Sequence, residues 1–288
     1  MPRGIDHLVL PVNDLVAARA GYERLGFTCT PDAFHPFGTK NFLVQIGHFF
    51  LEVLAVHDRA LYPDRVENDF SFPRFNDAFL DRNGEGISML VLDSTDPDAD
   101  RTQFTEAGLH VHAPFSFGRD AVLPDGTSAR VGFDLTFVSD PEMLDCGFFT
   151  CRQQHPPELF WKPQYQSHPN TARAISRVVF NGDDWRNHVA FFEGFTGAAA
   201  DIGDDSARFA TSRGDVVIAS PKAAGEMLHA RTRRSDTLRI AGYEVAVDDL
   251  DTLRECLDEG DAGYVVEPDT GRIALERPLH GATIVFAA

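Results

Sequence analysis

The chain has 288 residues, 43% of them hydrophobic, which is enough for two domains of ordinary size. Its 44 acidic and 26 basic residues give a formal charge of −18, which repels nucleic-acid phosphates and anionic lipid, so neither is an expected partner. A short basic cluster at residues 231–234 is typical of a solvated loop.

Four cysteines, Cys29, Cys146, Cys151 and Cys256, show no CxxC pairing and are too sparse for a disulfide framework. The first residues enter a strand-like run without an apolar signal core, and no apolar run reaches membrane length. We therefore expect a protein of the reducing cytoplasm that acts on a small molecule.

The first strand-like run, residues 4–10, carries His7 among apolar neighbours. Asp14 then leads a helical stretch that stops near residues 26–27, and a later strand-like run, residues 49–54, carries Glu52. A titratable group inside an apolar strand pays desolvation unless it meets a partner or a metal. His7 and Glu52 therefore predict a shared site.

This order of elements recurs. Copies begin near residues 86, 174 and 242, each with a strand, a helix led by an aspartate (Asp96, Asp184 or Asp249) and a glycine-preceded closing strand. We place four modules at about 4–56, 86–155, 174–220 and 238–287. Prolines interrupt the pattern after residue 155, which predicts an N-terminal domain at 1–156 and a C-terminal domain at 174–288, each with its own core.

The fourfold strand-helix-strand-strand-strand order resembles the vicinal oxygen chelate superfamily, which includes glyoxalases, bleomycin-resistance proteins and extradiol dioxygenases. The first copy resembles its glyoxalase-like branch at residues 5–10, 13–15, 25–27, 35–41 and 50–52. The resemblance implies an α+β fold in which four βαβββ modules pair into two curved mixed-sheet domains. Modules could pair within one chain or between two, so a homodimer is one expected arrangement.

In that superfamily the first and last strands of each module supply ligands to a divalent metal with open positions. The resemblance therefore implies that His7 and Glu52 bind zinc, nickel, manganese or iron. The partner module offers only Met89 and Cys151. This leaves three alternatives: a further ligand such as His155 or Cys151, completion by water, or a metal-free site.

The C-terminal modules place Arg177, Ala219, Tyr243 and Phe286 at the corresponding positions, which make no ligand set. We therefore expect the functional cavity in the N-terminal domain.

Further candidates surround this cavity. Glu52 or His35 would move a proton as catalytic groups, and four residues would contact substrate: Asn41, Phe149, Cys151 and Arg152. Arg152 could instead pair with Glu52. A glutathione site would need basic residues at the cavity mouth, for which the candidates are Arg152, Arg119 and Lys40.

Three functions follow from this reading. The first is a glyoxalase-like, metal-dependent lyase or isomerase that acts on a small oxygen-bearing substrate in an apolar cup. The second is a metal-free small-molecule-binding protein. The third is a ring-cleaving dioxygenase, which needs iron or manganese and a third strong ligand that the sequence does not locate.

Overall fold

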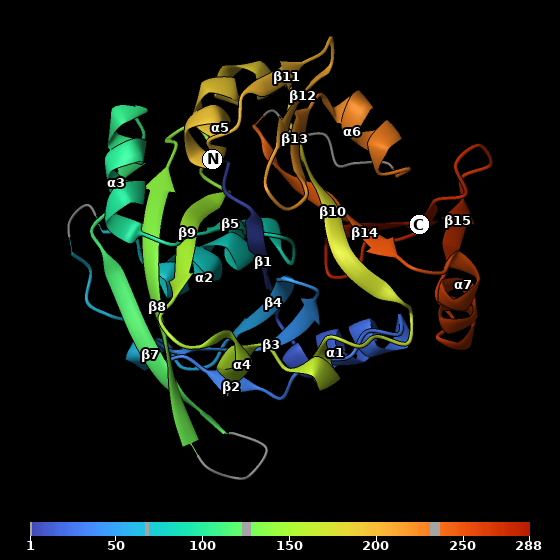
Figure 1. Ribbon diagram of the computed structural model, residues 1–288, viewed down its shortest axis with the longest axis horizontal. Helices are drawn as coiled ribbons and strands as arrows, with labels where there is room; N and C mark the ends of the chain where they lie inside the picture. Colours follow the sequence, from blue (N-terminus) through green and yellow to red (C-terminus); the bar gives the residue numbers. More distant parts are fainter. Residues whose placement is uncertain (1, 67–68, 123–127, 231–236) are drawn as a thin grey trace.

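The structure is a computed structural model that describes residues 2–66, 69–122, 128–230 and 237–288. The basic cluster at residues 231–234 lies outside the described residues. Two mixed sheets of nine and eight strands lie side by side (Figure 1). The strands of the first sheet are β1 Ile5–Pro11, β2 Ala33–Phe34, β3 Thr39–Ile46, β4 Phe49–Val56, β5 Met89–Asp93, β6 His110–Val111, β7 Phe115–Val122, β8 Ser128–Ser139 and β9 Gly147–Gln153. Those of the second are β10 Ala172–Asn181, β11 Ala200–Ile202, β12 Ser206–Ala210, β13 Asp215–Ala219, β14 Arg239–Val247, β15 Tyr264–Val266, β16 Ile273–Leu275 and β17 Thr283–Ala287.

Both sheets follow the same pairing rule. In the first, β1 runs parallel to β4 and antiparallel to β5, and β5 runs parallel to β9. In the second, β10 runs parallel to β13 and antiparallel to β14, and β14 runs parallel to β17. Each sheet therefore consists of two modules joined through their first strands within one chain. The predicted α+β fold of paired βαβββ modules is confirmed.

Seven helices accompany the sheets in the described part of the chain: α1 Leu15–Arg24, α2 Phe72–Asn83, α3 Pro97–Glu106, α4 Pro157–Phe160, α5 Val189–Thr196, α6 Pro221–Met227 and α7 Leu250–Glu259. Asp14, Asp96 and Asp249 each accept two backbone N–H bonds at the start of a helix, as the sequence predicted. Asp184 instead precedes a short 3-10 helix, Trp185–His188, and makes no side-chain cap. No helix in the described ranges is long and apolar enough to cross a membrane.

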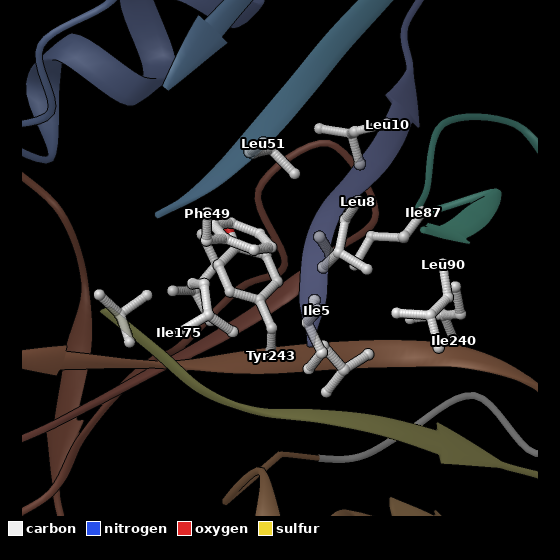
Figure 2. Close-up of a cluster of buried hydrophobic side chains, with 14 of the residues drawn as sticks. Ile5, Leu8, Leu10, Phe49, Leu51, Ile87, Leu90, Ile175, Ile240 and Tyr243 are labelled. Atoms are coloured by element: carbon white, nitrogen blue, oxygen red, sulfur yellow. The ribbon is translucent and has the colours of Figure 1, made fainter. Parts of the chain in front are cut away.

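The largest hydrophobic cluster belongs to both sheets. Figure 2 shows Leu8 and Leu51 of the first sheet facing Ile175 and Tyr243 of the second. The ring of Phe148 on β9 also meets four phenylalanines of the second half, Phe180, Phe191, Phe192 and Phe195. The sequence predicted a core for each half, and the largest cluster extends across both halves.

Strand alternation separates this shared core from a second apolar cluster on the opposite face of the first sheet. Along β1, Leu8 and Leu10 enter the shared core, whereas Val9 enters the second cluster with Phe50 and Phe149. We call this opposite face the N-terminal cup.

The matching face of the second sheet is occupied by the chain itself. Ala223 and Ala224 of α6 pack there against Val217 and Val285. Tyr243 and Phe286, which the sequence placed at ligand positions in this half, point into the shared core instead.

Candidate active site

A cavity of about 40 Å³ lies in the N-terminal cup. Among the described residues its wall consists of seven phenylalanines, two leucines and six polar side chains. The polar residues are His7, His35, Asn41, Glu52, Arg119 and Cys151. The cavity therefore brings together residues from β1, β3, β4, β7 and β9.

Glu52 is the centre of the polar group. Its carboxylate is buried on β4 and accepts a hydrogen bond from the side-chain amide of Asn41 through Oε1. The same Oε1 lies 3.6 Å from Nε2 of His35, and Oε2 lies 3.8 Å from Nε2 of His7. Burial raises the pKa of Glu52 above its ordinary value, although His7, the Asn41 amide and Arg119 oppose the shift.

Both histidines are held through their other nitrogen. Nδ1 of His7 lies 2.7 Å from Oδ2 of Asp6, and Nδ1 of His35 lies 2.8 Å from Oγ1 of Thr39. A carboxylate only accepts, so Nδ1 of His7 carries the proton and donates it. Burial lowers the pKa of His35 to about 3, which keeps this ring neutral. Each histidine therefore presents Nε2 to Glu52.

The contact between Asp6 and His7 depends on an irregularity in β1. Consecutive residues of a regular strand point to opposite faces. The pairing of β1 with β5 shifts between Ile5 and His7, where two residues advance against one on β5. Such a bulge re-aims a side chain, and here it lets neighbouring residues bond to each other.

Comparison with known proteins identifies the family. A family described as glyoxalase-like domain matches residues 5–195, about two thirds of the chain. The chain belongs to this family. No match is found among curated proteins.

Solved structures with the same fold support this assignment of architecture. A hypothetical protein from Staphylococcus aureus has a TM-score of 0.70 at 12% identity, with 98% of each chain covered. A mutant of 4-hydroxymandelate synthase from Streptomyces coelicolor has a TM-score of 0.62 at 14% identity, covering 99% of this chain and 92% of that one. A fusion of a xylose isomerase-like TIM barrel and a 4-hydroxyphenylpyruvate dioxygenase has a TM-score of 0.61 at 14% identity, covering 99% and 49%. At these identities the likeness shows the fold.

The imidazoles and the carboxylate of this glyoxalase-like cup are chemically suited to bind a divalent metal. Two ligands at about 2.0–2.2 Å from one ion lie at most about 4.4 Å apart, and Glu52 meets this limit with His7 and, separately, with His35. Each histidine faces a different carboxylate oxygen, so the donors are close in pairs. Within the described ranges, the one group of three donor atoms mutually within 4.8 Å lies elsewhere, at Asp140, Glu142 and His188.

Among the described residues, the partner module adds no histidine or carboxylate to the wall of the cup. In the first module, Glu52 pairs with Val9, which lies two residues after His7 on β1. The same two-residue offset can be applied to β5 and β9. If Met89 is equivalent to His7, Phe149 is equivalent to Glu52; if Val91 is equivalent to His7, Cys151 is equivalent to Glu52. The pair expected from the sequence, Met89 with Cys151, therefore combines two registers. Neither register supplies the two ligands typical of a four-ligand site.

Phe149 and Cys151 do line the cavity, as expected of substrate-contacting residues. The Phe149 ring meets His7 edge-on at 5.5 Å. Burial, followed by the charges of Asp6 and Glu52, raises the pKa of the Cys151 thiol well above its ordinary value. The raised pKa keeps Cys151 a neutral thiol, which makes it a poor nucleophile.

The structure places Arg152 and His155 outside this cavity. Arg152 follows Cys151 on β9 and so points to the other face, where it is exposed and lies 3.6 Å from Asp134. His155 lies beyond the end of β9, because the strand stops at Gln153 and Pro156 follows. Its Nδ1 contacts the backbone of Gly132, so it does not complete a ligand set with His7 and Glu52.

Arg119 is the basic residue that reaches the cavity. The sequence offered it only as one of three basic candidates. On β7 it has the same parity as Phe115 and Phe117, which also contribute aromatic rings to this cluster. This alternation was the signal that could have singled it out. Lys40 is not part of the wall.

Proposed function

We propose that the N-terminal cup is the active site of a glyoxalase-like lyase or isomerase, in which Glu52 moves a proton on a small oxygen-bearing substrate. A divalent ion would be held by His7 and Glu52, with His35 in place of His155 as the further donor. One observation carries this proposal: the buried Glu52 carboxylate lies between the Nε2 atoms of two histidines that are each fixed through Nδ1.

The protein's own groups suit proton transfer. A carboxyl whose pKa is raised toward neutrality can both take and return a proton at working pH, and burial shifts Glu52 in this direction. His35 stays neutral because burial lowers its pKa to about 3, so its Nε2, 3.6 Å from the same carboxylate, can accept a hydrogen bond from substrate or bind an ion. The surrounding phenylalanine rings exclude water, which strengthens electrostatic interactions inside the cup. A bound ion would add Lewis-acid polarisation of neighbouring substrate oxygens.

The test is calorimetric titration of metal-stripped protein with zinc, nickel, manganese and, anaerobically, ferrous iron. We expect one site that is lost in His7→Ala and Glu52→Gln and weakened in His35→Ala. His155→Ala and Asp140→Asn are matched controls, because one histidine and one carboxylate outside the cup are removed. Absence of binding in the parent, or a site lost only in Asp140→Asn, would contradict the metal assignment.

A second candidate is a metal-free small-molecule-binding protein. The observation that favours it is the missing ligand pair in the partner module, where Phe149 and Cys151 take carboxylate-equivalent positions. It predicts no metal binding in the same titration, and binding of a small molecule that is equal in untreated and metal-stripped protein.

A ring-cleaving dioxygenase is the third candidate. Two histidines and one carboxylate are the donor types of non-haem iron oxygenases, and His35 supplies the third donor that the sequence did not locate. Oxygen uptake by iron-loaded protein in the presence of a catechol supports this candidate, and turnover without oxygen excludes it.

The expected cytoplasmic location and homodimer remain predictions. The paired modules of the cup come from one chain, so a dimer is not needed to build the site. Size-exclusion chromatography with light scattering measures the oligomeric state directly.

A further inference from the structure

Arg119, which is half-buried, differs from two other arginines of limited exposure, Arg3 and Arg272. Arg3 lies 2.8 Å from Asp100, and Arg272 lies 2.9 Å from Glu244. Among the described residues, the Arg119 guanidinium has no hydrogen-bond partner and no carboxylate within 4 Å. It nevertheless lines the cavity. Burial lowers the pKa of Arg119, and the more distant charge of Glu52 opposes this shift.

A half-buried guanidinium beside an apolar wall loses part of its hydration without gaining a counter-charge, which is unfavourable. The other groups that could balance it within the cup are already engaged. Glu52 accepts from Asn41 and faces two histidines, and Asp6 bonds to His7. The cup therefore has an open place for one anionic group next to Arg119.

We propose that Arg119 is the anion-binding residue of the cup and that the ligand is a monocarboxylic acid with an apolar body. This inference rests on the proposal that the cup is the substrate site. A planar guanidinium matches a carboxylate with two parallel hydrogen bonds. Seven phenylalanines line the same cavity and contact the apolar body. A single arginine balances one negative charge, so a nucleotide or a dianion does not fit.

The size of the cavity limits the acid that enters without rearrangement. A volume of about 40 Å³ holds roughly three water molecules, which corresponds to a short aliphatic acid. A ring-bearing acid requires the rim to open. Phe117 of β7 meets Phe37, in the turn before β3, at a centroid distance of 5.1 Å. In the part of the chain that the structure describes, β7 pairs only with β8. Among the described residues, β7 therefore meets this side of the cup through side-chain contacts such as that of Phe117 with Phe37.

The experiment compares acids with their neutral amides. Metal-stripped protein is titrated with acetate and acetamide, which match the small volume, and with phenylacetate and phenylacetamide. We expect at least one acid to bind about tenfold or more tightly than its amide, as charge-assisted hydrogen bonds provide. This preference is lost in Arg119→Gln and retained in Arg152→Gln, a matched control with an exposed arginine on β9. Far-ultraviolet circular dichroism confirms that the variants are folded.

Three outcomes would overturn the proposal: equal affinity for acid and amide, a preference that persists in Arg119→Gln, or no binding of either acid at millimolar concentration. The titration contains no metal and records no turnover. Failure of the acid preference therefore leaves metal binding by His7 and Glu52 intact. Conversely, failure of metal binding leaves the role of Arg119 intact.

Discussion

Nε2 of His7 faces Oε2 of Glu52 across 3.8 Å, on neighbouring parallel strands of the first sheet. The approach is directed by Asp6, which holds Nδ1 of the same ring at 2.7 Å. A carboxylate behind an imidazole fixes its tautomer and raises its basicity, which is the usual support of a metal-binding or proton-accepting histidine. The bulge in β1 is therefore part of the site.

Asp6→Asn tests this support. Because an amide is uncharged and can bond to Nδ1 in either orientation, we expect metal affinity at the cup to fall about 10–100-fold. Calorimetric titration measures the affinity, and nitrogen-15 chemical shifts of His7 report its tautomer. Asp32→Asn, which removes a surface partner of Arg19, should leave both unchanged. An Asp6→Asn protein with parental affinity and tautomer would refute the positioning role.

Phe148→Ala tests the shared core. The side chain is fully buried and contacts rings of the second half, so its removal should lower the free energy of unfolding by about 3–5 kcal/mol. Phe34→Ala, at an exposed site, should change it by no more than about 0.5 kcal/mol. Urea unfolding followed by fluorescence gives both values.

The same core predicts that the two halves unfold together. The protein has two tryptophans, Trp161 beside the first sheet and Trp185 in the second half. The variants Trp185→Phe and Trp161→Phe each retain one tryptophan. The unfolding midpoint reported by that tryptophan should be the same in both, once each midpoint is corrected for the variant's own change in stability, which circular dichroism measures. Separate midpoints would show that the halves are independent units.

Arg3 and Asp100 form a buried ion pair at 2.8 Å, and Arg3 also donates to the carbonyl of Phe195 in the second half. Removal of one partner leaves an uncompensated charge, so Arg3→Met should cost about 3–5 kcal/mol of stability. The double variant with Asp100→Leu should recover part of this loss. Arg59→Ala, at an exposed pair with Asp77, should cost much less, because solvent screens the pair. Equal costs for the two arginines would contradict the argument.

Glu85 links the halves in a pH-dependent way. It accepts a bond from the backbone N–H of Asn13 and lies 2.7 Å from Nδ1 of His280. Burial alone would raise its pKa, but these bonds dominate and lower the pKa of Glu85. A lowered folded-state pKa gives stability that is present above the unfolded value, near 4.5, and is lost as pH falls through the folded value.

The stability difference between the parent and Glu85→Gln should therefore be full at pH 7 and shrink as pH falls below 4.5. Urea unfolding at several pH values measures it. Glu106→Gln, at an exposed site, should show no such trend. A gap that widens toward acid pH would reverse the assigned sign.

The thiols should react slowly in the folded protein. Burial raises the pKa of Cys29 and of Cys146 to about 12, and that of Cys151 well above its ordinary value. Because only the thiolate reacts, we expect iodoacetamide at pH 8 to label these three residues far more slowly than in the denatured chain. Mass spectrometry counts the labels, and rapid labelling of Cys151 would contradict its neutral state.

Much of the fold was predictable because its signals are local. Alternating apolar strands and the capping aspartates Asp14, Asp96 and Asp249 mark module starts in sequence and in structure. The helices α2 and α6 were not predicted, because they lie between the repeated elements and the repeat carries no information about them. The shared core could not be predicted either, because an apolar face has the same sequence pattern whether it packs against a helix or against another sheet.

The site divides in the same way. Strand parity placed Cys151 and His155 on one side of the strand, and Cys151 does line the cavity together with His7, Asn41 and Glu52. It failed for His155, where the strand ends before the residue. The bulge that joins Asp6 to His7 leaves no mark in the sequence, because it depends on the register with β5. Tertiary features of this kind, strand ends and strand register, decide which residues on the same side of a strand actually meet.

The two faces of β1 have a consequence for how this protein can change. Its alternate residues belong to different systems: His7 and Val9 meet the cup, and Leu8 and Leu10 meet the shared core. Replacement of cup-lining residues can therefore alter ligand preference without loosening the joint between the halves. Such a strand lets substitutions accumulate on one face while the other face stays under separate constraint.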